Sequence, residues 1–232
     1  MEGSGRSGRE GGKEVSNIHL VIGNKNYSSW SLRPWMALSM TGIPFRETVI
    51  PLDTPETAKL IAEHSGAGRV PVLYHGRRLV WESLAIMEYL AELFPEKHLW
   101  PKTVAARAMA RAVSNEMHAG FSALRNACPM NIRRKPRPVP MNDAVMRDIA
   151  RIEQLWRECR AKFGKGGKFL FGKFSIADAM YTPVVSRFET FAIPVADDTR
   201  AYMATILNTP AFSAWREAAL KETWIVPADE VD

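Results

Sequence analysis

The chain has 232 residues and a mass of 26.0 kDa, and its 46% hydrophobic and 24% charged content is that of a folded protein with a substantial core. No apolar run approaches the roughly 18 residues that a membrane-spanning helix needs, so we expect no transmembrane segment. The net charge is +6 and the pI is near 9.4, but the basic residues are spread along the chain, which disfavours a nucleic-acid partner.

The densest basic run lies at residues 133–138 and reads Arg-Arg-Lys-Pro-Arg-Pro, without interleaved aromatic residues. We interpret it as a solvated, proline-stiffened connection between helices, in preference to an electrostatic attractor for anionic substrates or a nucleic-acid patch.

Residues 1–16 are rich in glycine and charge and lack the apolar stretch of a secretory signal, so we expect a disordered extension or a tag remnant. Cys128 and Cys159 are far apart and have neither a metal-ligand nor a Cys-x-x-Cys spacing. We expect both to be small buried apolar residues in a reducing cytoplasm. The chain contains no His/Cys ligand cluster and no phosphate-binding glycine loop, so no metal or nucleotide is expected.

The first 95 residues alternate between strand and helix patterns. Strands are predicted at residues 18–22, 45–50, 70–73 and 79–81, and helices at residues 32–41, 56–64 and 83–94. Gly42 is expected to end the first helix, and Asp53-Thr54-Pro55 to cap the second with proline at its first position. His75-Gly76 is short enough to join the last two strands as a hairpin.

After residue 102 the pattern is helical and shows no strand signals. One long helix is predicted from about 104 to 127, with a buried face that includes Met117, Gly120 and Phe121, and a second long helix at 143–163. Ser175 and Asp178 have the spacing of a capping box, for which we expect a role in folding. Further on, a proline at position 183 is expected to interrupt that helix with a kink near 179, and Thr209-Pro210 to cap the last helix.

Residues 68–90 contain the most informative pattern of the chain. Pro71 stands just before an apolar strand, where proline is tolerated only at an edge or at the first strand residue, so an unusual backbone is expected there. Glu82-Ser83 stands where the next strand gives way to helical spacing, so Ser83 is a predicted N-cap or first-turn residue. The unpaired N–H groups and the dipole of a helix start suit a carboxylate.

A second polar motif, Ser-Ser-Trp-Ser at residues 28–31, lies between the first strand and the first helix. Together with residues 68–90 and the helical second half, it resembles the soluble glutathione transferases, particularly the serine-type classes near the zeta class, over residues 18 to about 225. The resemblance implies an α/β thioredoxin-like N-terminal domain at 17–95, a linker at 96–102 and an all-α C-terminal domain at 103–232, as in the glutathione transferase fold.

The resemblance also implies that the chain binds reduced glutathione. In that family the Val-Pro peptide is cis and the valine main chain pairs with the cysteinyl part of glutathione, roles that fall on Val70 and Pro71 here. The Glu-Ser pair that holds the γ-glutamyl end corresponds to Glu82 and Ser83. Arg69 directly precedes this motif, where relatives often have a basic or amide residue near the glycyl end.

By the same resemblance the thiol-activating hydroxyl belongs to Ser28, with Ser29 as the alternative. Tyr27 could instead supply a phenol, as in the tyrosine-type classes. From the residues alone, the serine run could simply cap the following helix. Trp30 replaces the cysteine of zeta-like relatives, which disfavours thiol–disulfide exchange, and the indole could wall the pocket for the electrophile or be a core residue.

The electrophile is expected between the two domains, near Trp30, Met117, His118 and Phe121. His118 is predicted to share a helix face with Ser114 and Arg125, where it could orient a substrate or shuttle a proton, although a lone helical histidine is more often solvated. Arg33 and Arg69 are the residues that we expect to bind carboxylates.

We therefore expect a cytoplasmic glutathione transferase that conjugates glutathione to small electrophiles in detoxification, with the serine hydroxyl stabilising the thiolate. The resemblance leaves two alternatives: a maleyl-acid isomerase that recycles glutathione, or a non-catalytic binding module on the same fold. It also implies a homodimer.

Overall fold

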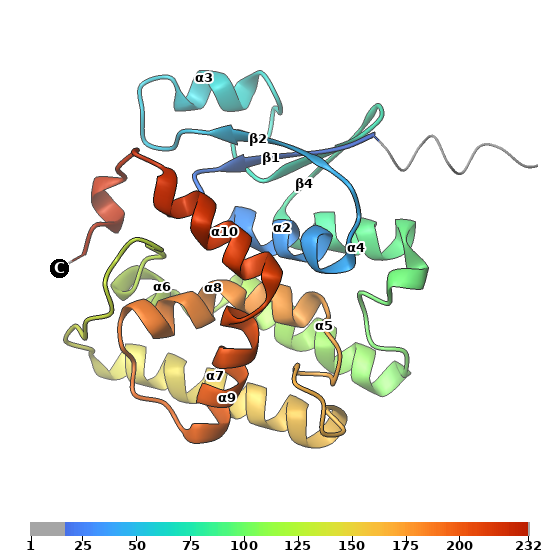
Figure 1. Ribbon diagram of the computed structural model, residues 1–232, viewed down its shortest axis with the longest axis vertical. Helices are drawn as coiled ribbons and strands as arrows, with labels where there is room; N and C mark the ends of the chain where they lie inside the picture. Colours follow the sequence, from blue (N-terminus) through green and yellow to red (C-terminus); the bar gives the residue numbers. More distant parts are fainter. Residues whose placement is uncertain (1–16, 232) are drawn as a thin grey trace, which may run out of the picture.

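A four-stranded mixed sheet organises the first half of the protein in the computed structural model, which describes residues 17–231 (Figure 1). The strands are β1 (Ile18–Gly23), β2 (Arg46–Ile50), β3 (Val72–His75) and β4 (Arg78–Trp81). Their order is β2-β1-β3-β4, with β1 parallel to β2 and antiparallel to β3, and with β3 and β4 forming a hairpin. The predicted extension at residues 1–16 lies outside the described residues.

Three helices cover the sheet. Helices α2 (Ser29–Thr41) and α4 (Ser83–Leu93) lie between the sheet and the helical half of the protein, whereas α3 (Thr57–Ala62) lies on the opposite side (Figure 1). Gly42 ends α2 as predicted, because its left-handed backbone, with φ of 67°, lets its N–H bond to the carbonyls of Leu38 and Ser39. The predicted thioredoxin-like arrangement is confirmed.

Several predicted boundaries in this half are shifted. Helix α3 spans Thr57–Ala62 rather than 56–64 and its N-cap is Glu56, so the prediction that Asp53-Thr54-Pro55 caps it, with proline at its first position, is wrong. The Thr57 hydroxyl accepts the N–H of Thr54 at 2.9 Å and thereby holds these residues in a turn before the helix. The hairpin turn lies at residues 76–77, one position later than predicted, since His75 still pairs with Arg78 in the ladder.

The second half of the chain is helical. Its elements are the 3-10 helix η2 (Pro95–Lys97), then α5 (Val104–Ala119), α6 (Ser122–Ala127), α7 (Asp143–Phe163), α8 (Ile176–Thr190), α9 (Asp197–Leu207), α10 (Pro210–Lys221) and the 3-10 helix η3 (Pro227–Asp229). The predicted bounds of α7 are confirmed, as is the cap on α10, where the Thr209 hydroxyl accepts the N–H of Phe212. Helix α9 was not predicted.

The predicted continuous helix from 104 to 127 is wrong, because the chain breaks between α5 and α6. Gly120 is extended, and Phe121 takes a left-handed conformation with φ of 57°. A Cβ at Gly120 would lie 2.7 Å from the carbonyl oxygen of Glu116, so only glycine fits the break. The new helix start is capped from α7, where the Asp148 carboxylate accepts the N–H of Leu124 at 3.0 Å.

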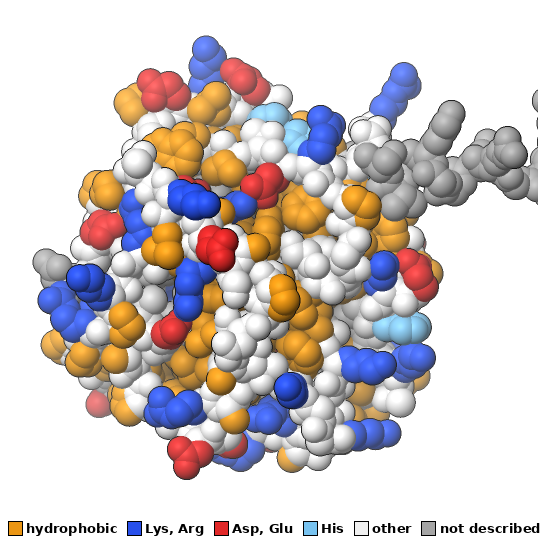
Figure 2. All heavy atoms as spheres, in the orientation of Figure 1, with side chains coloured by type: hydrophobic (Ala, Val, Ile, Leu, Met, Phe, Trp, Pro, Cys, Tyr) orange, Lys and Arg blue, Asp and Glu red, His pale blue; other side chains and the backbone are white. Residues whose placement is uncertain are grey.

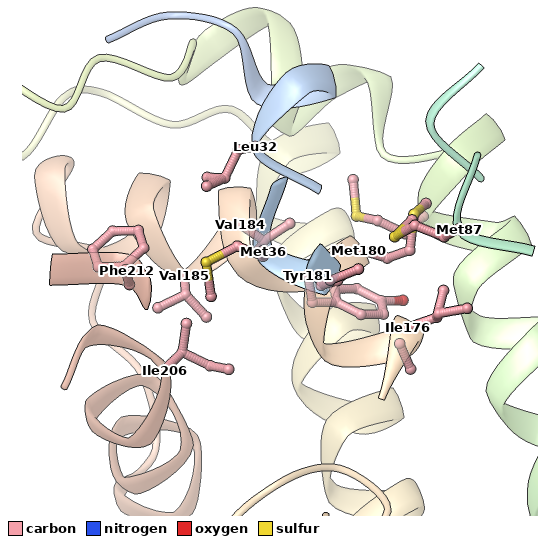
Figure 3. Close-up of a cluster of buried hydrophobic side chains, with 14 of the residues drawn as sticks. Leu32, Met36, Met87, Ile176, Met180, Tyr181, Val184, Val185, Ile206 and Phe212 are labelled. Atoms are coloured by element: carbon pink, nitrogen blue, oxygen red, sulfur yellow. The ribbon is translucent and has the colours of Figure 1, made fainter. Parts of the chain in front are cut away.

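Helix α8 is the centre of a hydrophobic core that joins the two halves. Figure 3 shows side chains from α2, α4, α9 and α10 converging on it, and all of them are buried: Leu32, Met36, Met87, Ile176, Met180, Tyr181, Val184, Val185, Ile206 and Phe212. This shared burial favours a fixed arrangement of the two halves, and a cleft between them therefore has stable walls.

Pro183 lies inside α8, which runs without a break, so the predicted interruption is wrong, whereas the kink near Ala179 stays a prediction. Proline removes one helical hydrogen bond, but α8 is packed on all sides, and burial of its apolar residues outweighs the loss. The hydroxyl of Thr182 donates to the carbonyl of Asp178 within the same turn.

The predicted capping box at the start of α8 is confirmed and forms part of a larger network. The buried carboxylate of Asp178 accepts four hydrogen bonds, from the backbone N–H groups of Leu170 and Ser175 and from the hydroxyls of Ser175 and Tyr202. Burial raises the pKa of Asp178 to about 6, although these donors pull it down. The residue connects the loop before α8 with α9, which supports its predicted role in folding.

The cysteines are free and buried, as predicted. Burial raises the pKa of Cys128 to about 11 and that of Cys159 to about 12, so neither thiol is an accessible nucleophile. Basic and acidic side chains are interspersed on the face shown in Figure 2. None of the helices between residues 17 and 231 combines the length and the apolar character that a membrane crossing needs.

Candidate functional site

Two adjoining cavities of about 420 Å³ each lie where the sheet half meets the helical half. The first, which we call the serine cavity, is lined by residues from the bend after β1, from α6 and α8 and from the C-terminal segment. The second, which we call the Glu82 cavity, is lined by Trp30, Arg69, Val70, Pro71, Glu82 and His118. Trp30, Arg69 and Val70 line both cavities, so the two form one continuous site.

The Glu82 cavity contains the predicted binding motif. The peptide bond between Val70 and Pro71 is cis, as the resemblance predicted. Glu82 is the N-cap of α4 in a left-handed conformation, with φ of 70°, and Ser83 is the first helical residue. The carboxylate of Glu82 lies 3.6 Å from Nη1 of Arg69.

Ser83 follows Glu82 directly behind the wall of this cavity and has a polar group that the fold itself does not use. Its hydroxyl is fully buried and has no hydrogen-bond partner within residues 17–231. It lies at the start of α4, where the first N–H groups of a helix are unpaired and the dipole is positive. The Ser83 hydroxyl and the helix start could together bind the carboxylate of a ligand. The neighbouring carboxylate of Glu82 could bind an ammonium group of the same ligand.

The serine motif joins the end of β1 to the start of α2 through a chain of hydrogen bonds. Ser28 caps α2 by accepting the N–H of Ser31 at 3.4 Å, which confirms that it caps the helix. The Ser28 hydroxyl also donates to the Ser31 hydroxyl at 2.7 Å, and the latter accepts the N–H of Gly23 at 3.0 Å. Ser28 and Ser29 both line the serine cavity, and Ser29 forms no side-chain hydrogen bond to the described residues.

The phenol of Tyr27 is occupied by two other side chains. It donates to Glu230 and accepts from the guanidinium of Arg133. Burial, followed by the hydrogen bond to Glu230, raises the pKa of Tyr27. These bonds disfavour Tyr27 as the thiol-activating group, although it lines the serine cavity.

Trp30 stands between the two cavities within a cluster of cationic and aromatic groups. The guanidinium carbons of Arg33 and Arg125 lie 4.2 and 4.4 Å from its ring centroid, and the His118 ring meets it edge-on at 5.3 Å. Burial, followed by the charge of Arg33, lowers the pKa of His118, while Glu82 opposes this shift. His118 is therefore a neutral imidazole near pH 7, which suits hydrogen bonding to a substrate more than charge pairing.

Met117 and Phe121 occupy a different place from the one predicted. Both side chains are buried in the hydrophobic core, and neither lines the serine cavity or the Glu82 cavity. The break between α5 and α6 explains this for Phe121, because its left-handed backbone turns the residue away from the face that a continuous helix would present.

The C-terminal segment forms one wall of the serine cavity, which the sequence did not predict. The carboxylate of Glu222 accepts the N–H groups of Lys25 and Asn26 at 2.7 and 2.9 Å, so the segment after α10 is fastened to the bend after β1 (Figure 1). Beyond this anchor, Val226 and Asp229 line the cavity.

Two arginines of the basic run at 133–138 bind the C-terminal segment that forms this wall of the serine cavity. Arg133 donates to the carbonyls of Glu222 and Trp224, and Arg134 donates to the carbonyl of Val231. The prediction of a merely solvated connection is therefore wrong for these two arginines, which hold the C-terminal segment in place.

Comparison with known proteins places these features in a family. Residues 27–93 match the family model described as glutathione S-transferase, N-terminal domain. A probable maleylacetoacetate isomerase of Caenorhabditis elegans is 27% identical over 86% of this chain and 94% of its own length. A zeta-class glutathione S-transferase of Euphorbia esula is 27% identical over 68% of this chain and 71% of its own length.

The fold agrees with these matches. A crystal structure of a glutathione transferase homolog from Burkholderia gl BGR1 superposes with a TM-score of 0.67 and 22% identity, over 87% of this chain and 97% of that one. The chain thus has the glutathione transferase fold, and its residues 27–93 form a glutathione S-transferase N-terminal domain. Its relatives include zeta-like proteins that match most of its length.

Proposed function

We propose that this protein binds reduced glutathione in the Glu82 cavity and conjugates it to small electrophiles in the serine cavity. The observation that carries the proposal is one continuous site that brings Val70 and Pro71 together with Glu82 and with the hydroxyl of Ser28. The Burkholderia homolog was crystallised with bound glutathione, which supports the choice of ligand.

Each part of the tripeptide has a matching group in the cavity. The carboxylate of Glu82 would hold the γ-glutamyl ammonium, while the Ser83 hydroxyl and the first N–H groups of α4 would hold the γ-glutamyl carboxylate. The main chain of Val70 would pair with the cysteinyl residue. Arg69, whose side chain is exposed at the rim, would attract the glycyl carboxylate.

The proposed chemical role of Ser28 is to hold the sulfur as a thiolate. A cysteine thiol has a pKa near 8.5, and lowering it by about two units requires roughly 2.7 kcal/mol. One hydrogen bond to a charged group contributes about 1.5 to 3 kcal/mol, and a helix N-terminus about 0.3 to 1 kcal/mol more. A hydroxyl at the start of α2 therefore suffices without a strong base.

The hydrogen-bond chain behind Ser28 can support that role by reversing one donor. In the free protein the Ser28 hydroxyl donates to Ser31. When a thiolate approaches, rotation of the two hydroxyls lets Ser31 donate to Ser28 and Ser28 donate to sulfur, while Gly23 N–H still donates to Ser31. Aligned donors of this kind polarise one another, which strengthens the bond to sulfur.

In the proposed conjugation the thiolate sulfur attacks an electrophilic carbon. With an aromatic halide, a C–S bond forms, the halide leaves with its electron pair, and the thiol proton passes to solvent. In the isomerase alternative, sulfur adds to a maleyl acid and leaves again after bond rotation, so no glutathione is consumed. The isomerase name of the Caenorhabditis elegans relative is the observation that keeps this second candidate.

The two candidates differ in whether glutathione disappears. We expect that an aromatic halide consumes glutathione in proportion to enzyme, and that a maleyl acid is not isomerised at a comparable rate. The measurement is parallel titration of free thiol and chromatography of the acid, with enzyme-free mixtures as controls. Isomerisation of the maleyl acid without thiol consumption, and no conjugation of the halide, would overturn the transferase proposal in favour of the isomerase.

Ser83→Ala tests the assignment of the glutathione site. Because the buried hydroxyl has no partner among the residues that the structure describes, its removal should leave the free energy of unfolding unchanged or raise it by up to about 1 kcal/mol. The same variant should bind glutathione about tenfold more weakly, as measured by calorimetry. Ser213→Ala, at an exposed position of α10, is the matched control and should change neither quantity. Unchanged affinity in Ser83→Ala would contradict the assignment.

The proposal also carries over the homodimer and the cytoplasmic location that the family resemblance implies. Activation by Ser28 rather than by Ser29 is likewise part of the proposal.

A further inference from the structure

Arg33, on α2, is a fully buried arginine whose guanidinium forms no hydrogen bond with any described residue. Its relative exposure is 0%, and Nε, Nη1 and Nη2 all lack an acceptor within residues 17–231. The contact with the Trp30 ring does not replace the hydrogen bonds that five N–H donors make in water. A buried charge left unsatisfied in this way is costly, and it points to an acceptor that a ligand brings.

Two further guanidinium groups lie next to it and reach the serine cavity. Arg125 on α6 and Arg187 on α8 both line that cavity. Each is oriented by one backbone carbonyl: Nη1 of Arg125 donates to His118 at 3.3 Å, and Nε of Arg187 donates to Cys128 at 2.8 Å. Arg187 is only 4% exposed, and its Nη1 has no partner. Each side chain is therefore fixed in place, with donors left over for a ligand.

The cluster is not neutralised by the protein. Among residues 17–231 no carboxylate forms an ion pair with any of the three arginines. The acidic groups that face it are Glu82, which lies nearest Arg69 and His118, and Asp229 on the C-terminal segment. After burial, the mutual repulsion of the guanidinium groups is the main effect that lowers the pKa of Arg33. An anion would relieve both the repulsion and the unsatisfied donors.

We infer that Arg125 and Arg187 form a subsite for the carboxylate of the electrophilic substrate, beside Trp30, and that the buried charge of Arg33 behind them strengthens its attraction for an anion. This inference rests on the proposed function and names its substrate class, a small aromatic or unsaturated acid. A carboxylate fits because its two coplanar oxygens match the fork of a guanidinium. The rest of such a molecule would contact the apolar residues of the same cavity, such as Leu52, Met130 and Val226.

A matched pair of probes tests the subsite. The acid 4-chloro-3-nitrobenzoate and its neutral amide, 4-chloro-3-nitrobenzamide, share the reactive carbon and differ in one charge. We expect calorimetry on the wild-type protein without glutathione to show about tenfold tighter binding of the benzoate. With glutathione, kcat/KM divided by the rate constant of the uncatalysed reaction should favour the benzoate by a similar factor, because this ratio removes the greater intrinsic reactivity of the benzamide. Equal affinity and equal kcat/KM for the two probes would overturn the inference.

Variants then assign the preference to residues. Arg125→Gln, at a half-buried position, should lower kcat/KM for the benzoate by about 10- to 100-fold through KM, while the benzamide changes less than about twofold. Arg187→Gln should do the same where circular dichroism shows that it folds. The control is Arg157→Gln, an exposed arginine of α7 that pairs with Asp198. Equal losses for both probes in Arg125→Gln would overturn the inference.

The calorimetric arm separates this inference from the proposed function, because it needs no glutathione. Tighter binding of the benzoate with no conjugation of either probe would overturn the proposed transferase function and support an anion site alone. Conjugation of both probes at equal rates would support the transferase and overturn the carboxylate subsite.

Discussion

Replacing Ser28 with alanine is expected to lower kcat/KM for conjugation of glutathione to an aromatic halide by about 100-fold. The Ser28 hydroxyl is the group at the start of α2 that both lines the serine cavity and is backed by further donors, Ser31 and Gly23. Without it the bound thiol loses its hydrogen bond, and its pKa should return toward about 8.5. The measurement is the pH profile of kcat/KM together with the ultraviolet absorbance of the bound thiolate.

Ser29→Ala and Ser213→Ala accompany this variant. Ser213 lies exposed on α10, so its replacement should leave the pH profile unchanged. If Ser29→Ala shows the loss and Ser28→Ala does not, the activating role passes to Ser29, which lines the same cavity. If both variants keep wild-type turnover and thiol acidity, the serine mechanism is wrong.

Replacing Asp178 with alanine is expected to lower the free energy of unfolding by roughly 3 to 5 kcal/mol. The carboxylate accepts four hydrogen bonds in a fully buried place, and its loss would leave the donors of Leu170, Ser175 and Tyr202 unsatisfied together. Urea denaturation followed by circular dichroism measures the effect. Asp143→Ala, an exposed carboxylate in the first turn of α7, is the control, with an expected loss below about 1 kcal/mol.

The pH dependence of this difference distinguishes the buried carboxyl from a surface one. The pKa of Asp178 is raised from 3.8 to about 6 in the folded state, so the titration of this group contributes stability that is fully present below about pH 4 and is lost as pH rises through 6. The difference in the free energy of unfolding between the wild type and Asp178→Ala should therefore increase as the pH falls from 7 to 5. A difference that stays constant over that range would show that the pKa of this carboxyl is not raised in the folded protein.

Local patterns in the sequence predicted the elements that local interactions define. The bounds of α7 follow from its apolar spacing, and the end of α2 follows from a glycine that can adopt a left-handed backbone. The break between α5 and α6 was missed because its cap comes from Asp148, a residue 24 positions away in the next long helix. The continuity of α8 through Pro183 was missed because packing against several helices decides it.

In the candidate site, too, the residues marked by a local pattern were predicted, and those placed by tertiary packing were not. The Val70–Pro71 and Glu82–Ser83 pairs were identified because the strand-to-helix pattern marks their positions, and the family resemblance gave them roles. Arg187 had no signal, since an arginine near the end of a helix is usually a solvated residue. Arg187 lines the cavity because of the way α8 packs in the folded protein, and a local sequence pattern does not predict such packing.

The anchoring of residues 222–231 has a practical consequence for work at the bench. Because Glu222 and the residues after it build part of the cavity wall, an affinity handle or a fluorescent fusion attached behind them would strain that wall and distort measured affinities. Immobilisation through the solvent-facing side of α7, where Arg151 and Arg157 are exposed, leaves this wall untouched.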